Sequence, residues 1–426
     1  MSFETISVIG LGYIGLPTAA MFAAYGKKVI GVDVNQHVVN TINRGEIHIV
    51  EPALDAIVRK AVNDEKLKAV LTPEQADAFL IAVPTPFLPT ATDGDVPQPD
   101  LKYIQAAAKA IAPVLKKGDL VILESTSPVG ATEKLSGWLA EYRTDLTFPE
   151  THNEESDIRI AHCPERVLPG HVVRELVEND RVIGGLTTKC SEQAVELYKT
   201  FVQGDCVTTN ARTAEMAKLT ENSCRDVQIA FANELSIICD KLDINVWELI
   251  SLANRHPRIN ILEPGPGVGG HCIAVDPWFI VSKSPEEAQL IHTARKVNDA
   301  KPIWVINKVK LALADFLQAN PNKTVGDIRI TCFGLAFKAN IDDLRESPSL
   351  EIAKKIAEMH TSTVSFVEPN IKVLPSNLSH NAQLIKLDEA AAQTDIAVML
   401  VEHDEFKEDV GFGNNISVVD TKGIWK

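Results

Sequence analysis

The sequence predicts an α/β protein in which two parallel-sheet domains are joined by a long central helix within an all-helical middle domain. Residues 1–210 and residues 319–426 alternate short apolar runs with helical patterns, which is typical of parallel sheets. Between them, residues 211–318 carry a helical pattern that runs for about 30 residues from Thr213. A chain of 426 residues is too long for one ordinary core, so three domains with these boundaries are expected.

Composition excludes several classes of protein. The chain is 45% apolar and 23% charged, and no apolar run reaches the roughly 20 residues of a membrane span. The amino-terminal residues lack a secretory pattern. Seven scattered cysteines without a CxxC pair indicate reduced thiols in a cytoplasm, with neither disulfides nor a metal site. The net charge of −15 argues against nucleic-acid binding, so an anionic substrate would have to meet a local cluster of basic residues.

The first element is a dinucleotide-binding βαβ unit. The strand Thr5–Ile9 leads into a GxGxxG loop and a helix that Gly26 ends, and a second strand spans Lys28–Val32. The loop residues are Gly10, Leu11, Gly12, Tyr13, Ile14 and Gly15. Asp33 follows the second strand, where an acid binds the adenosine ribose and repels a 2′-phosphate, so NAD is expected rather than NADP. The alternative is a glycine-rich turn without a ligand.

Two further strands bring hydroxyl groups to the same edge of the predicted sheet. Ala78–Val83 runs into Thr85, and Leu120–Leu123 runs into Thr126. Ligands of open parallel sheets collect at the carboxyl ends of the strands, so both threonines are expected to contact the cofactor. Alternatively, each is a turn hydroxyl that bonds only backbone. Glu165 and Arg166 follow a later strand and should point to the same edge.

The long central helix carries a polar stripe. Glu215, Lys218, Asn222 and Arg225 are spaced 3, 4 and 3 apart, which places them on one side of a helix. A solvated, salt-bridging face is the common alternative. The amide of Asn222 and the apolar residues that follow argue that part of the stripe faces protein.

A short helix, Val246–Ala253, precedes a basic segment and a glycine-rich loop. His256 and Arg258 in the segment are candidates for phosphate contacts. The loop, Gly265–Pro277, contains Cys272 and, four residues later, Asp276. If Cys272 opens a helix, the exposed N–H groups would favour a thiolate that can attack a carbonyl carbon. A buried, inert cysteine is the alternative, and the loop alone does not decide between them.

The last third predicts a helix at Pro302–Phe316 and then a second alternation of strands and helices. The strands are expected at Ile328–Phe333, Thr363–Val367, Ile396–Val401 and Ser417–Val419, with a helix at Ser349–Met359. No GxGxxG follows the first of these strands. Lys338 and Arg345 stand there instead and suit an anionic ligand, which indicates a nucleotide site of a different kind.

Taken together, the motifs resemble those of the UDP-sugar 6-dehydrogenase family over essentially the whole chain. They are, in order, GLGYIG, PTP, ESTSPVG, PER, AEMAKLTEN, GPGVGGHCIAVDP and FKANIDDLRESP. The segment CPERVLPG resembles the N-acetylhexosamine branch. Pro169 stands where the glucose enzymes carry a second glutamate, which argues against UDP-glucose. The chain is most similar to the branch that oxidises UDP-N-acetyl-D-mannosamine in enteric bacteria for enterobacterial common antigen.

This resemblance implies two Rossmann-like domains and a four-electron, NAD-dependent oxidation of the sugar C6 alcohol. Cys272 would form a thiohemiacetal and then a thioester. Lys218 and Asn222 would stabilise the oxyanion, and Asp276, with Glu165, would act on the hydrolytic water. The implied NAD contacts beyond the glycines are Tyr13, Ile14, Asp33, Thr85, Thr126 and Arg345. The implied UDP-sugar contacts are Arg166, Val167, Lys218, Asn222, Arg225, His256, Arg258, Gly269, Phe337 and Lys338.

The resemblance also assigns a role to each domain. Residues 1–210 would bind NAD, residues 211–318 would form a homodimer through the central helix, and residues 319–426 would bind the UDP-sugar. Three other functions stay open. They are a UDP-N-acetylglucosamine 6-dehydrogenase, a single-hydride hydroxy-acid dehydrogenase, and a non-catalytic NAD-binding regulator. The sugar of the first of these differs from N-acetylmannosamine only in the configuration at C2.

Overall fold

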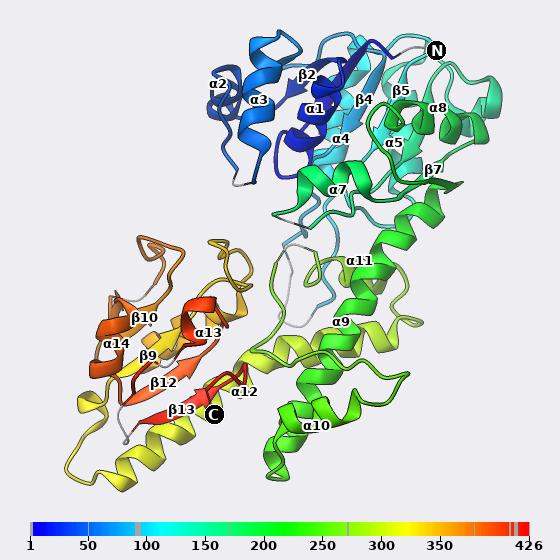
Figure 1. Ribbon diagram of the computed structural model, residues 1–426. Helices are drawn as coiled ribbons and strands as arrows, with labels where there is room; N and C mark the ends of the chain where they lie inside the picture. Colours follow the sequence, from blue (N-terminus) through cyan, green and yellow to red (C-terminus); the bar gives the residue numbers. More distant parts are fainter. Residues whose placement is uncertain are drawn as a thin grey trace. The chain divides into compact units, whose positions relative to one another are not determined.

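The computed structural model describes residues 3–49, 51–89, 95–168, 170–270, 272–378, 380–408, 410–412 and 416–425, so Pro169 lies outside the described residues. The chain divides into two compact units. The first unit comprises Met1–Glu221 with Trp278–Pro285, and the second comprises Asn222–Pro277 with Glu286–Lys426. The prediction of two α/β units with parallel sheets is confirmed (Figure 1). Within the described ranges, no helix combines the length and apolarity that a bilayer crossing requires.

The described part of the first unit contains a sheet of eight strands in the order β3-β2-β1-β4-β5-β6-β7-β8. The strands are β1 (Thr5–Ile9), β2 (Lys28–Val32), β3 (Leu67–Val70), β4 (Ala78–Ile81), β5 (Leu120–Leu123), β6 (Arg159–His162), β7 (Arg181–Gly185) and β8 (Cys206–Asn210). All neighbours are parallel except β6 and β7. The strand predicted at Ala78–Val83 ends earlier than expected, at Ile81, because Ala82 and Val83 already belong to the loop at the sheet edge.

Helices cover both faces of this sheet, and its strands β4 and β5 are apolar throughout. The helices are α1 (Gly15–Ala24), α2 (Gln36–Asn43), α3 (Leu54–Asn63), α4 (Lys102–Ile111), α5 (Ala131–Tyr142), α6 (Pro149–His152), α7 (Val172–Glu178) and α8 (Thr188–Tyr198). Leu80 of β4 packs into the same core cluster as α1, α3 and α8, whereas its neighbours Phe79 and Ile81 pack with α4 and α5.

The described part of the second unit contains a parallel sheet of five strands in the order β11-β10-β9-β12-β13. The strands are β9 (Ile330–Phe333), β10 (Val364–Val367), β11 (Ala382–Leu384), β12 (Ile396–Met399) and β13 (Ser417–Asp420). The helices are α10 (Val246–Ala253), α12 (Gln289–Ala319), α13 (Pro348–Met359) and α14 (Leu387–Gln393). Two more helices, α9 (Ala211–Lys241) and α11 (Asp276–Lys283), contribute residues to both units. The sheet repeats the strand order of β3-β2-β1-β4-β5.

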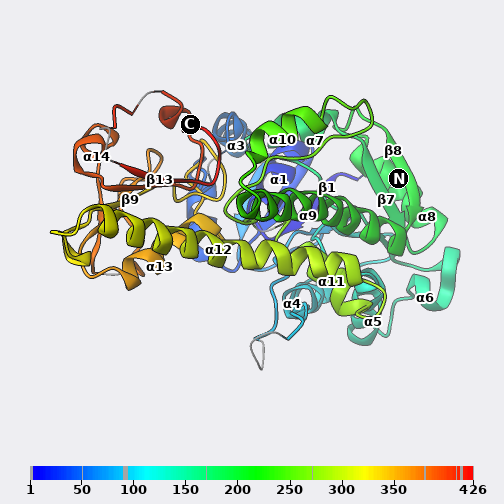
Figure 2. The ribbon, with the colours of Figure 1, turned by 90° about the horizontal axis from the view of Figure 1, so that it is seen from below.

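Helices α9 and α12 run side by side within the second unit (Figure 2). Arg295 contacts Asp226 at 2.6 Å, and Lys308 contacts Asp240 at 2.7 Å. The predicted start of this helix at Pro302 was wrong, because α12 begins at Gln289 and contains the proline. Its ring faces the glycine loop: a Cβ placed on Gly267 would lie 3.3 Å from Cγ of Pro302.

Candidate active site

The glycine loop after β1 combines two kinds of glycine. Gly10 has a φ of +91°, and a Cβ on it would lie 2.6 Å from the carbonyl oxygen of Ala82. A Cβ on Gly15 would lie 1.8 Å from the carbonyl oxygen of Gly10, so both positions are required by the packing of the chain. A Cβ on Gly12 would meet nothing within 4 Å. The loop therefore leaves open space at the position where a pyrophosphate approaches the backbone, which fits NAD.

Polar groups at the same sheet edge also fit a dinucleotide. Asp33 is half-buried and accepts hydrogen bonds from the N–H groups of Leu11 at 3.0 Å and Asn35 at 2.9 Å, which aim the carboxylate at the loop. The hydroxyl of Thr85 is buried and has no hydrogen-bond partner among the residues that the structure describes. Its alternative role as a turn hydroxyl bonded to backbone is thus wrong. A buried orphan hydroxyl is completed by a ligand or by water. Thr126 is half-buried after β5.

Glu165 is held by a guanidinium that sequence reasoning missed. It accepts hydrogen bonds from Nη2 of Arg181 at 3.0 Å and from the Arg166 N–H at 2.7 Å. Arg181 is buried over the Tyr198 ring and lies 3.9 Å from Glu124. Burial, reinforced by the charge of Glu165, raises the pKa of Glu124 to about 8. No sequence signal links β7 to β5 and to the PER segment, because the sheet alone brings them together.

The polar stripe on α9 serves more than one purpose. Glu215 is buried and accepts hydrogen bonds from the N–H groups of Gly130 at 2.6 Å and Thr132 at 2.8 Å, so it caps α5. A solvated face is therefore the wrong interpretation for Glu215. Lys218 and Asn222 are half-buried, one turn apart on the helix. The last member of the stripe, Arg225, is exposed.

Within the second unit, the cysteine loop packs against the segment from Phe337 to Glu346. A Cβ on Gly269 would lie 2.5 Å from the carbonyl oxygen of Glu346, and one on Gly270 would lie 3.1 Å from the Phe337 ring. Gly270 also has a φ of +82°. The glycines are required here because the loop lies directly on the segment that contains Lys338, which is exposed. Two motifs that are far apart in the sequence thus form one structure.

Cys272 is exposed, so a buried, inert thiol is the wrong interpretation. Cys272 does not open a helix, which was the condition considered for a thiolate, because α11 begins at Asp276. The Cys272 carbonyl instead accepts the Asp276 N–H at 2.8 Å, in a turn that leads into the helix. Asn222 donates from Nδ2 to Oδ2 of Asp276 at 2.5 Å, and Asp276 is buried. The second unit therefore assembles a thiol, a carboxylate and an amide, which are the groups that nucleophilic chemistry at a carbonyl requires.

The remaining predicted residues lie on loops and at exposed edges. His256 and Arg258 are exposed on a loop that the side chain of Asn254 closes through two hydrogen bonds with Ile261. Arg345 makes a bidentate ion pair with Asp343, at 2.8 and 2.6 Å. In the first unit, Arg166 pairs with Glu221 at 2.6 Å, Val167 packs against the core, Tyr13 is exposed, and Ile14 precedes α1.

Comparisons with known proteins agree along the chain. Three models of the UDP-glucose/GDP-mannose dehydrogenase family match it: the NAD binding domain at residues 4–202, the central domain at 212–300 and the UDP binding domain at 331–426. A UDP-N-acetyl-D-mannosamine dehydrogenase of Salmonella typhi is 64% identical over 427 residues, which cover 100% of both chains. An NDP-N-acetyl-D-galactosaminuronic acid dehydrogenase of Ralstonia nicotianae is 62% identical over 100% of this chain and 97% of its own. The solved UDP-D-ManNAc dehydrogenase of Pyrococcus horikoshii has a TM-score of 0.85 at 37% identity, covering 99% and 96%.

Proposed function

The chain belongs to the UDP-glucose/GDP-mannose dehydrogenase family, and we propose that it oxidises the C6 alcohol of UDP-N-acetyl-D-mannosamine to the carboxylate of UDP-N-acetyl-D-mannosaminuronate. The chain is an NAD-dependent oxidoreductase. The observation that carries the chemistry is the exposed Cys272, whose carbonyl accepts the N–H of Asp276, while the Asp276 carboxylate accepts from Asn222. The choice of sugar is supported by the full-length relative from Salmonella typhi.

The reaction removes two hydrides from C6, and NAD, when bound, accepts one of them in each oxidation. The first removal, with loss of the hydroxyl proton, gives an aldehyde. The Cys272 thiolate then forms a C–S bond, and the resulting thiohemiacetal keeps one hydrogen on C6. Loss of this hydrogen as the second hydride leaves a thioester. Water breaks the C–S bond and regenerates the thiol. One alcohol, two NAD and one water thus give one carboxylate, two NADH and three protons.

The neighbouring residues take the roles that this chemistry needs. Lys218 and the amide of Asn222 stabilise the alkoxide and the tetrahedral oxyanion, because both present hydrogen-bond donors. Asp276 orients Asn222 through their 2.5 Å hydrogen bond. We assign activation of the hydrolytic water to Asp276, assisted by Glu165, and proton transfer from the C6 hydroxyl to Lys218.

The binding residues, domain roles and assembly are part of the same proposal. We assign NAD to Gly10, Gly12, Tyr13, Ile14, Gly15, Asp33, Thr85, Thr126 and Arg345. We assign the UDP-sugar to Arg166, Val167, Lys218, Asn222, Arg225, His256, Arg258, Gly269, Phe337 and Lys338. The three-domain division is supported by the three family models. We further propose a cytoplasmic homodimer built on α9 that supplies enterobacterial common antigen synthesis.

The stoichiometry of the reaction tests the covalent step. The wild type should form two NADH per sugar, whereas Cys272→Ser should form no net uronate and still bind NAD. Cys224→Ser is the matched control, since Cys224 is another exposed cysteine of the second unit. Full turnover by Cys272→Ser would refute the mechanism, and one NADH per substrate would favour a single-hydride dehydrogenase.

A second substrate deserves a direct test because the relative from Ralstonia nicotianae is nearly as similar as the one from Salmonella typhi. Values of kcat/KM should be compared on the UDP-linked N-acetylmannosamine, N-acetylglucosamine and N-acetylgalactosamine. We expect the mannosamine sugar to be preferred. Preference for either of the other two sugars would overturn the assignment of the sugar and leave the four-electron chemistry intact.

A further inference from the structure

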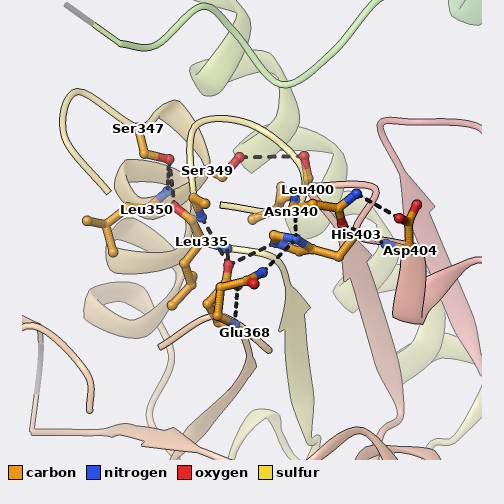
Figure 3. Close-up of polar contacts among 11 residues, drawn as sticks. Leu335, Asn340, Ser347, Ser349, Leu350, Glu368, Leu400, His403 and Asp404 are labelled. Atoms are coloured by element: carbon orange, nitrogen blue, oxygen red, sulfur yellow. Dashed lines mark hydrogen bonds and ion pairs between the residues drawn. The ribbon is translucent and has the colours of Figure 1, made fainter. Parts of the chain in front are cut away.

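Two buried side chains of the second unit, Glu368 and His403, form a pair at the carboxyl ends of β10 and β12 (Figure 3). Oε2 of Glu368 accepts hydrogen bonds from the N–H groups of Leu335 at 2.7 Å and Ala336 at 3.1 Å, and from Nε2 of His403 at 3.0 Å. Burial raises the pKa of the Glu368 carboxyl, but the bonds from His403 and Leu335 outweigh it and leave this pKa below its usual value.

The hydrogen bonds also fix the proton on the imidazole. Nδ1 of His403 lies 2.9 Å from the backbone N–H of Asn340, which can only donate. Nδ1 is therefore the acceptor, and the ring proton sits on Nε2 and points at Glu368. Asn340 has a φ of +62°, and its side chain bonds the Asp404 N–H at 3.0 Å and carboxylate at 2.8 Å. The loop from Leu335 to Asn340 is thus tied at both ends, with Lys338 exposed between the ties.

The equivalent positions in the first sheet are arranged as a ligand site. Gly10 and Gly334 donate equivalent hydrogen bonds to the second strand of their sheets, at 2.8 and 2.9 Å. Leu11 bonds Asp33 as Leu335 bonds Glu368. Thr85 follows β4, and His403 follows β12, by the same number of residues. Thr85 is an orphan hydroxyl and Asp33 is half-buried, whereas the Glu368 carboxylate is closed off. The acid of the second sheet therefore holds a loop.

We propose that Glu368 and His403 are positioning residues that lock the Leu335–Asn340 loop so that Lys338 is presented to the diphosphate of a uridine nucleotide. This inference rests on the proposed function, since it assigns Lys338 to the nucleotide sugar. The loop also supports the cysteine loop, because Phe337 lies against Gly269 and Gly270. The pair thereby acts on binding through the loop, without touching the ligand.

Two substitutions at one position separate the bond that His403 Nε2 donates to Glu368 from the bonds that Nδ1 accepts, which come from the Asn340 N–H and, at 3.1 Å, from Nδ2 of Asn370. In His403→Gln the amide can still donate to Glu368, but nothing accepts the Asn340 N–H at the position of Nδ1. In His403→Asn the side-chain oxygen takes the position of Nδ1, and the donor to Glu368 is lost. The exposed His380, changed to Gln and to Asn, is the matched control in the same unit. Calorimetry with UDP measures binding without turnover, and the KM for NAD reports on the other ligand.

We expect His403→Gln to weaken UDP binding by about three- to tenfold, the loss that one hydrogen bond brings. His403→Asn should stay within about twofold of the wild type, although its Tm falls as well, and the KM for NAD should not change in either variant. Equal UDP affinity in all variants, an affinity loss that only follows Tm, or a wild type that does not bind UDP would each overturn the inference. Failure of turnover on every UDP-sugar, with these UDP affinities as expected, would overturn only the proposed reaction.

Discussion

At the scale of single residues, Gly12 separates folding from ligand binding. A Cβ on Gly12 meets nothing within 4 Å, so Gly12→Ala should leave Tm unchanged. The added methyl group would occupy the approach of the pyrophosphate, and we expect the KM for NAD to rise at least about tenfold. Gly10→Ala is the contrasting variant, because its φ of +91° and the nearby Ala82 carbonyl should lower Tm. An unchanged KM for NAD in Gly12→Ala would contradict the assigned cofactor loop.

His162, on β6, gives the first unit a pH dependence. Burial lowers the pKa of His162 to about 3. Below pH 6.5 the unfolded chain takes up a proton that the folded chain refuses, so stability is fully present above pH 6.5 and falls as the pH falls towards 3. At pH 5 the loss is about 2 kcal/mol. His162→Leu should therefore gain stability relative to the wild type between pH 8 and pH 5, measured by urea unfolding. A gap between the two proteins that does not change with pH would contradict this.

At the scale of elements, a buried polar chain links α9 and α12 to the cysteine loop. Asn233 accepts the Gly265 N–H at 2.9 Å and donates to Asn298 at 2.9 Å, and Asn298 donates to Asp226 at 2.8 Å. Asn233→Ala leaves buried groups unsatisfied, at a cost of about 2 kcal/mol. We expect Tm to fall by about 4 to 8 °C and kcat to fall while the KM for NAD stays constant.

Asn307→Ala is the control for this prediction, since Asn307 is exposed on α12. If Asn233→Ala lost stability while keeping the wild-type kcat, the chain would hold the two helices together without holding the loop. Equal Tm values in both variants would contradict the proposed cost of the unsatisfied groups.

Elements were predictable where their signals are local. The first βαβ unit was found because apolar runs, glycines and Asp33 lie within one short segment. The start of α12 was missed because Pro302 is a strong local helix breaker. Packing of α12 along α9 stabilises the helix on both sides of the proline. Glu215 was predicted only as part of a polar stripe, because its partners, Gly130 and Thr132, are far away in the sequence. Long-range hydrogen bonds produce no periodic pattern in the sequence.

At the scale of the whole molecule, the fold contains a repeat that the sequence hides. The order β11-β10-β9-β12-β13 matches β3-β2-β1-β4-β5, and Gly334 and Glu368 take the places of Gly10 and Asp33. A single glycine and a single acid carry no recognisable motif without GxGxxG. The likeness therefore becomes visible only through strand pairing, and the two sheets are expected to have separate ligands.

Hydrogen exchange tests whether each sheet has its own ligand. A ligand that binds the folded state stabilises it by about 2.7 kcal/mol at one hundred times its Kd, and protection should concentrate around its site. NAD alone should protect the Gly10–Gly15 loop and Asp33, and UDP alone should protect the Leu335–Asn340 loop. In Gly12→Ala the protection by NAD should fall while that by UDP stays the same, because the two glycine turns are built independently. Protection of the first loop by UDP alone would mean that the assignment of one nucleotide to each sheet is wrong.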